Sequence, residues 1–245
     1  MINKVTFELV ERTRAFAMET DGLIAQLPGN AVTVYNPLDY AWDLHRQYLE
    51  TFGQEHVEIF LLGMNPGPFG MVQDGVPFGE VNFVKQFLKI DGKVDKPENE
   101  HPSRPVLGLS CPRSEISGKR LWTLMQSHYG NKEAMEGKLF VSNYCPLAFI
   151  SNEKNGRNIT PDKLPLEFRK KLEVVCDAYL TDILVLLSPL HVGGIGNYAA
   201  KKLKHICKDG QDVITLLHPS PANPLANKDW AGICTAQIKA AGLWN

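Results

Sequence analysis

Hydrophobic residues along the chain gather in short runs, and the run at residues 57–62 is the most informative of them. Its sequence, VEIFLL, mixes β-branched and aromatic residues over the length of one strand, which is typical of a strand buried on both faces. Five glycines and prolines follow within residues 63–70, a density that neither a helix nor a strand tolerates. The pattern predicts a buried strand that ends in a stiff turn, and the one amide in that turn is Asn65.

The rest of the chain alternates between short apolar runs and longer segments with helical spacing. Further strands are predicted at residues 139–142, 183–187 and 213–217. Helices are predicted at residues 4–27, 39–52, 81–90, 119–129, 161–180 and 197–207, and after residue 230. Three of these helices have an expected N-cap, which is Asp39, Ser117 or Thr160. Loops are predicted at residues 72–80, 91–118 and 144–160, and a glycine-rich turn at residues 193–196.

Four short apolar strands separated by helices indicate an α/β protein with a parallel sheet. Polar residues stand at three of the strand ends: Asn65 before a proline, Asn143, and His218 before another proline. Each of the three alone is also a common turn-stabilising residue. The carboxyl ends of parallel strands lie on one edge of a sheet, and α/β proteins bind ligands there. We therefore expect these three side chains to converge on one pocket.

Composition limits the classes of protein and partner. The 245 residues, 44% of them hydrophobic, suit one globular domain over residues 1–245. A net charge of −1 gives no general attraction to nucleic acid, so any such binding must use a local patch. The five scattered cysteines include no C-x-x-C pair, which disfavours a disulfide framework, a zinc ribbon and an iron–sulfur cluster. The sequence has no signal peptide and no apolar run of membrane-spanning length.

The residues at the predicted strand ends restrict the chemistry. They include no carboxylate and no serine in a nucleophile-elbow pattern, so the residues that acyl transfer and carboxylate–metal chemistry require are absent from these strand ends. They include no lysine either, which disfavours Schiff-base chemistry. The pattern Gly194-x-Gly196-x-x-Ala199 is a weak match to a dinucleotide-binding fingerprint and would make the protein a nicotinamide-dependent oxidoreductase. Tight packing of a strand on a helix is the favoured interpretation of these small residues, and we expect no metal, nucleotide or other cofactor.

Several long motifs resemble, in order, those of the single-strand-selective monofunctional uracil-DNA glycosylases, a family of the uracil-DNA glycosylase superfamily. The motifs are YNPLDYAW (35–42), GMNPGPFGM (63–71), GVPFGEV (75–81), RPVLGLSCPRSEISG (104–118), NYCPL (143–147), GRNITP (156–161) and HPSPANPLANKDW (218–230). The resemblance implies a three-layer α/β/α sandwich around a central four-stranded parallel sheet. It also implies a base-excision repair enzyme that removes uracil from DNA.

By that resemblance, each residue of the expected pocket has a role. Asn65 positions the hydrolytic water, His218 stabilises the departing base, Asn143 reads the pyrimidine edge and Phe78 stacks on the base. Gly67 leaves space beside C5 of the base, which would admit 5-substituted uracils such as 5-hydroxymethyluracil. Met64 and Met71 complete the expected substrate-binding set.

The resemblance further implies that residues 219–230 wedge into the duplex beside the extruded nucleotide. The expected DNA-binding residues of this segment are Ser220, Pro221, Ala222, Asn223, Leu225 and Lys228. Vertebrate relatives have an arginine where this chain has Ala222, and an alanine cannot fill the gap left by a flipped base. Leu225 is the expected partial substitute.

The sequence therefore predicts a monofunctional glycosylase that hydrolyses the N-glycosidic bond of uracil, and of 5-substituted uracils, in single- and double-stranded DNA. Two alternatives remain open: a glycosylase mainly for deaminated purines (xanthine or hypoxanthine), and a non-catalytic reader of damaged DNA. We expect a monomer without a membrane partner, in the cytosol or nucleoid of a bacterium or in the nucleus of a eukaryote.

Overall fold

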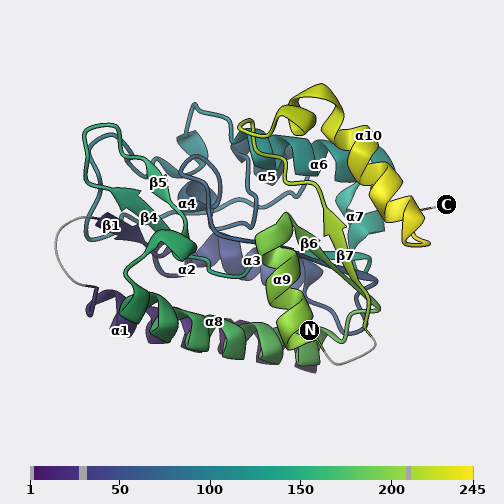
Figure 1. Ribbon diagram of the computed structural model, residues 1–245, viewed down its shortest axis with the longest axis horizontal. Coiled ribbons are helices and arrows are strands. Elements are labelled where there is room, and N and C mark those ends of the chain that lie inside the picture. Colours follow the sequence, from purple (N-terminus) through teal and green to yellow (C-terminus); the bar gives the residue numbers. More distant parts are fainter. Residues whose placement is uncertain (1–2, 28–31, 208–210, 245) are drawn as a thin grey trace.

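The computed structural model describes residues 3–27, 32–207 and 211–244, and a four-stranded parallel sheet lies at its centre (Figure 1). The order of its strands is β3-β2-β6-β7, and all neighbours are parallel. Their bounds are β2 Ile59–Gly63, β3 Leu139–Asn143, β6 His191–Ile195 and β7 Val213–Leu216. Every residue of β2 and β3 is buried, as expected for strands covered on both faces. The predicted α/β fold with a central four-stranded parallel sheet is confirmed.

Helices cover both faces of this sheet. On one side lie α1 and α8, which run side by side along the lower edge of the view in Figure 1, with α3 and α9 packed against them. On the other side α10 packs on α6 and on β7. The bounds are α1 Lys4–Ile24, α3 Trp42–Phe52, α6 Ile116–Tyr129, α8 Leu166–Leu187, α9 Asn197–Ile206 and α10 Pro224–Ala240. None of the helices in the described part of the chain is both long and apolar enough to span a membrane.

Aromatic residues join the first helical layer to the sheet. The rings of Phe60 in β2 and Phe140 in β3 stack with centroids 5.9 Å apart. Tyr48 of α3 lies 5.5 Å from Phe140 and donates its hydroxyl to the carbonyl of Val141 at 2.8 Å. Because a buried hydroxyl needs such a partner, this bond fixes α3 over the two strands that lead to the site.

One predicted strand is wrong. Residues 183–187 belong to α8, where Ile183 and Leu187 are buried while Val185 is 71% exposed. A spacing of four between buried residues is that of a helix, and the short apolar run ILVLL did not distinguish the two structures. The third strand is instead β6, at residues predicted to form a glycine-rich turn, so that prediction is wrong as well.

Glycines in β6 allow α9 to lie directly on the sheet. A Cβ atom at Gly194 would collide with the backbone of Ala200 in α9, and one at Gly193 would lie 2.9 Å from the side chain of Leu61. This confirms the interpretation of these small residues as tight strand–helix packing.

A second sheet, which the sequence did not predict, lies beside the first. It is antiparallel with the order β1-β4-β5, formed by β1 Val32–Tyr35, β4 Ala148–Ser151 and β5 Asn158–Ile159. Two of these strands lie in the segment predicted as a loop at residues 144–160. They have four and two residues, too few for an alternating pattern to stand out.

Several helix boundaries also differ from prediction. Asn36, not Asp39, caps the short helix α2 (Pro37–Tyr40), and α3 begins separately at Trp42. The N-cap of α6 is Glu115 rather than Ser117. Thr160 precedes only a 3₁₀ turn, η2 (Pro161–Lys163), and its side chain makes no cap hydrogen bond. Shorter helices complete the fold: α4 Met71–Asp74, α5 Val81–Gln86, η1 Gly108–Ser110 and α7 Lys132–Met135.

Candidate active site

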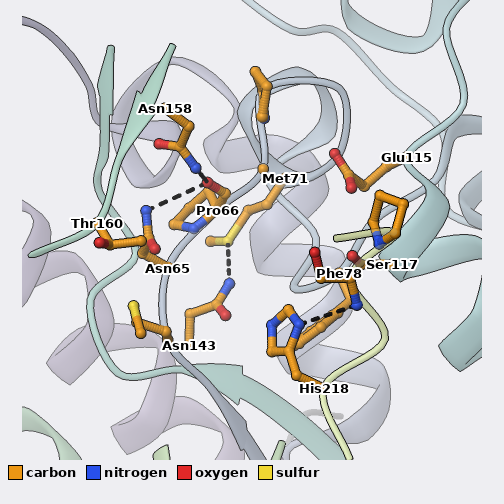
Figure 2. A pocket seen from close by; sticks show the side chains of 15 residues that line it. Asn65, Pro66, Met71, Phe78, Glu115, Ser117, Asn143, Asn158, Thr160 and His218 are labelled. Carbon is orange, nitrogen blue, oxygen red and sulfur yellow. Dashed lines mark hydrogen bonds between the residues drawn. The ribbon is translucent and has the colours of Figure 1, made fainter. Parts of the chain in front are cut away.

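A cavity of about 430 Å³ opens beyond the carboxyl ends of β2, β3 and β7 (Figure 2). Asn65, Asn143 and His218 all line it, so the predicted convergence of the three strand ends is confirmed. Six further residues that the sequence analysis assigned to the site also line it: Met64, Gly67, Met71, Phe78, Ser220 and Pro221.

The backbone holds the first two strand ends in register. Gly63 of β2 pairs with Asn143 of β3. Beyond this pair, the N–H of Tyr144 donates to the carbonyl of Gly63, and the N–H of Cys145 donates to that of Met64, both at 2.9 Å. The two turns therefore leave the sheet together, which brings the two asparagines to one cavity.

The amide of Asn65 is oriented by the turn itself. Its Nδ2 faces the carbonyl of Pro66 at 3.5 Å, and the same carbonyl accepts a shorter hydrogen bond of 3.2 Å from Nδ2 of Asn158 (Figure 2). With the nitrogen directed to Pro66, the amide oxygen remains as an acceptor. An acceptor at this position is suited to hold a water molecule.

Asn143 is nearly completely buried, with 5% exposure, and is held on both sides. Its Nδ2 donates to the sulfur of Met71 at 3.3 Å. A Cβ at Gly63 would lie 2.5 Å from its Oδ1, so the strand residue before the turn must be small. Sulfur is a weak acceptor, and a carbonyl oxygen in the cavity would replace it readily. The amide thus offers one donor and one acceptor to a planar ligand.

The tautomer of His218 follows from its hydrogen bond. Its Nδ1 accepts from the backbone N–H of Ser220 at 3.1 Å. A backbone N–H can only donate, so the proton of the neutral ring is on Nε2. Burial lowers the pKa of His218, which favours this neutral form. Figure 2 shows the second ring nitrogen on the side of the cavity, where it is an N–H donor.

Phe78 lies in a turn that packs against α6. It adopts a left-handed φ of 54°, which is uncommon for a bulky residue. Its carbonyl accepts the indole N–H of Trp122 at 3.0 Å, and a Cβ at Gly118 would collide with that same carbonyl. The close approach of α6 fixes the ring at the wall of the cavity, where it can stack on a planar ligand.

The comparisons with known proteins agree with this geometry. The family model described as "Uracil DNA glycosylase superfamily" matches residues 50–233. The chain belongs to this superfamily. It is 44% identical over 221 residues to the single-strand selective monofunctional uracil-DNA glycosylase of Rattus norvegicus, covering 89% of this chain and 79% of the relative. The corresponding protein of Bos taurus is 44% identical over 213 residues, or 86% and 78% of the two chains.

A solved structure shows the same fold. The crystal structure of wild-type Pedobacter heparinus SMUG2 superimposes with a TM-score of 0.64 at 17% identity, over 96% of this chain and 97% of that one. The resemblance read from the motifs is therefore confirmed, and so is the expected architecture of the superfamily.

The segment predicted to wedge into the duplex, residues 219–230, begins as a loop and continues as a helix. Asn223 caps α10 by accepting from the N–H of Leu225 at 3.0 Å, so Leu225 and Lys228 lie on the helix rather than in a loop. Ala222 is exposed, and Leu225 is 54% exposed. Ala222, Asn223, Leu225 and Lys228 do not line the cavity, and their contact with DNA stays a prediction.

Arg120 of α6 forms hydrogen bonds that hold this loop in place. Its guanidinium donates to the carbonyl of Pro219 at 2.8 Å and to Oδ1 of Asn227 at 2.9 Å. The amide of Asn227 in turn donates to the carbonyl of Pro221 at 2.8 Å. A chain of hydrogen bonds thus runs from the second helical layer to both ends of the exposed tip.

The sequence analysis missed several residues that line the cavity. Asn158 and Thr160 come from β5 and the turn after it, which were expected to form a loop and a helix cap. Glu115 and Ser117 come from the start of α6, and both lie in the segment predicted as a loop at residues 91–118. The motifs GRNITP and SEISG contain these residues, so the resemblance marked the segments but not their individual side chains.

Proposed function

We propose that this protein is a monofunctional DNA glycosylase that hydrolyses the N-glycosidic bond of uracil in DNA and leaves an abasic site. One observation carries the proposal: three side chains of complementary chemistry line a single cavity in a chain of this superfamily. They are the amide of Asn65, which can orient a water molecule, the amide of Asn143, which can recognise a base, and the neutral imidazole of His218, which is a hydrogen-bond donor. The relatives at 44% identity are named as enzymes of this activity.

The reaction produces a negative charge on uracil and a positive charge on the sugar, and residues of the site can interact with each. The C1′–N1 bond breaks with its electron pair remaining on uracil, so the sugar becomes an oxocarbenium-like cation. The Nε2–H of His218 donates to O2 of uracil, where much of the negative charge collects. A donor of this kind is worth roughly 2.7–4 kcal/mol in a transition state.

Water then adds to C1′ of the sugar. The cation is so electrophilic that the water needs to be positioned more than deprotonated, and the free amide oxygen of Asn65 is suited to that task. The cavity has no lysine among its described lining residues, in keeping with a monofunctional enzyme that forms no Schiff base.

Recognition of the base depends on the side of the cavity formed by Asn143 and Met71. Nδ2 of Asn143 exchanges the Met71 sulfur for O4 of uracil, and Oδ1 accepts from N3–H. Cytosine would present a donor to Nδ2 and an unprotonated nitrogen to Oδ1. The base reaches the cavity only after it is flipped from its stack, at a cost of a few kcal/mol that is smallest in single strands and mismatches.

The proposal is tested with oligonucleotides that carry one uracil, xanthine or hypoxanthine, in single strands and in duplexes. Cleavage of the uracil strand after alkali, and none before it, is the expected result. Faster cleavage at xanthine or hypoxanthine would identify a purine-directed enzyme. Tight binding of uracil-containing DNA without any abasic product would identify a non-catalytic reader.

A further inference from the structure

The strand that carries Asn143 lies at one edge of the central sheet. Among the strands that the structure describes, β3 pairs with β2 alone. On its outer side, the hydroxyl of Tyr48 takes the place of a neighbouring strand at Val141. This hydroxyl donates to the carbonyl of Val141 and accepts from its N–H, both at 2.8 Å. Because Val141 is two residues before Asn143, the chain is held on that side of the amide.

Tyr144 holds the chain on the other side of Asn143. Its side chain is 1% exposed and contacts two helices. The hydroxyl donates to Oδ1 of Asp177 in α8 at 2.6 Å, and the ring meets that of Tyr198 in α9 edge-on, with centroids 5.8 Å apart. Neighbouring residues of an extended segment point to opposite sides. Asn143 therefore faces the cavity, while Tyr144 anchors the same segment to the helices on the other side (Figure 2).

A lysine in turn holds Asp177. Nζ of Lys202 in α9 lies 3.4 Å from Oδ1 of Asp177 and 4.6 Å from the centroid of the Tyr144 ring. The Lys202 side chain is only 16% exposed, so salt screens this ion pair less than it screens a pair on the surface. Burial and then the hydrogen bond to Asp177 raise the pKa of Tyr144, which keeps its hydroxyl a donor. The anchor of Tyr144 is therefore a connected set of contacts.

Tyr144, Asp177 and Lys202 do not line the cavity, so they can act on the reaction only through a residue that does. Asn143 is the lining residue next to Tyr144 in the chain. We propose that Tyr144, anchored by Asp177, is a positioning residue that holds the Asn143 amide in place for the edge of uracil. The inference rests on the glycosylase function proposed above. A displacement of about 1 Å in such a group can cost about 10²-fold in rate.

The test is a double-mutant cycle on single-turnover excision of uracil from one single-stranded oligonucleotide. Tyr144→Phe removes the hydroxyl and keeps the ring, and it should slow excision about 10-fold, which is within the range for a displaced positioning group. In the Asn143→Ala background no amide remains to be positioned, so the same change should have little effect. Such non-additivity is expected of residues that act together.

Tyr198→Phe is the matched control. The Tyr198 hydroxyl is buried and has no hydrogen-bond partner among the described residues. Its removal deletes the same group from the same cluster, and it should leave the rate unchanged. Equal losses for Tyr144→Phe in the wild-type and Asn143→Ala backgrounds would mean that Tyr144 supports the fold as a whole, and they would overturn the inference. A loss for Tyr198→Phe equal to that for Tyr144→Phe, or an unchanged rate for Tyr144→Phe, would also overturn it.

Two changes at Asp177 test the other end of the anchor. Asp177→Asn keeps an oxygen that accepts from the Tyr144 hydroxyl, so it should excise uracil nearly as fast as the wild-type protein. Asp177→Ala removes the acceptor and should reproduce the loss of Tyr144→Phe. Equal rates for the two Asp177 variants would contradict the anchoring role of this hydrogen bond. Absence of uracil excision by the wild-type protein would instead refute the proposed function.

Discussion

Replacement of His218 tests the assignment of the leaving-group donor. His218 presents Nε2–H to the cavity because its Nδ1 accepts from Ser220 at 3.1 Å. Loss of one preorganised donor costs roughly 2.7–4 kcal/mol, so His218→Ala should excise uracil about 10²- to 10³-fold more slowly in single turnover. His218→Asn should show a similar loss, because its shorter side chain does not extend to the position of Nε2. Both variants should fold, since the residue lies at a strand end and is only partly buried.

The dependence on the leaving group separates this role from a structural one. The 5-fluorouracil anion is intrinsically more stable than that of uracil, so it depends less on the donor, and the loss should be smaller on that base. Gly196 packs against the His218 ring, where a Cβ would lie 3.2 Å from Cδ2, so substitution also removes a packing contact. A uniform loss across leaving groups would therefore point to displacement of the whole loop and would refute the assignment.

The pH profile gives a second check on the same residue. Burial lowers the pKa of His218 from its ordinary value of 6.5, so the neutral donor persists as the pH falls through that value. The single-turnover rate on uracil should stay constant down to pH 6.5 and fall only below it. An inflection that belongs to His218 at or above this pH would contradict the neutral form.

Three further changes test other parts of the account. Asn65→Ala should keep binding to uracil-containing DNA but lose about 10²-fold or more in single-turnover rate, as expected when an orienting group is removed; a near-normal rate would mean that another group holds the water. Ala222→Arg should raise excision from a paired duplex and do little on single strands, with wild-type rates in the order single strand or U:G above U:A; equal gains on all substrates would exclude Ala222 as the missing wedge. Asp74 is completely buried, and burial raises its pKa well above 3.8. The folded state therefore holds a proton that the unfolded state releases. The free energy of unfolding should decline as the pH rises through and beyond 3.8. Asp74→Asn should remove this decline and raise the melting temperature at neutral pH relative to acidic pH, and an unchanged pH dependence of melting would contradict the burial argument.

The strand ends were predictable because their signals are local. A buried apolar run, a polar residue and a proline identified Asn65, Asn143 and His218, and parallel topology alone was enough to bring them together. The same locality explains the error at residues 183–187. An apolar run of five residues fits a buried strand or one face of a helix. The strand β6 was not predicted because it contains glycines, which are needed there for α9 to pack closely on the sheet.

The walls of the cavity were not predictable in the same way. Glu115 reaches the site only because Gly67 and Gly70 leave room for it, and Asn158 reaches it only because a two-residue strand pairs with β4. Both placements depend on contacts between segments far apart in the chain. No periodicity or spacing within either segment reports such contacts.

The most direct test of the central claim is mass spectrometry of the products formed from a single-stranded oligonucleotide with one uracil. The account predicts free uracil and an intact strand that carries one abasic site, with strand scission only after alkali, and far slower uracil release by Asn65→Ala than by the wild-type protein. An unchanged oligonucleotide under single-turnover conditions with excess wild-type protein, or a strand cut before alkali, would contradict it.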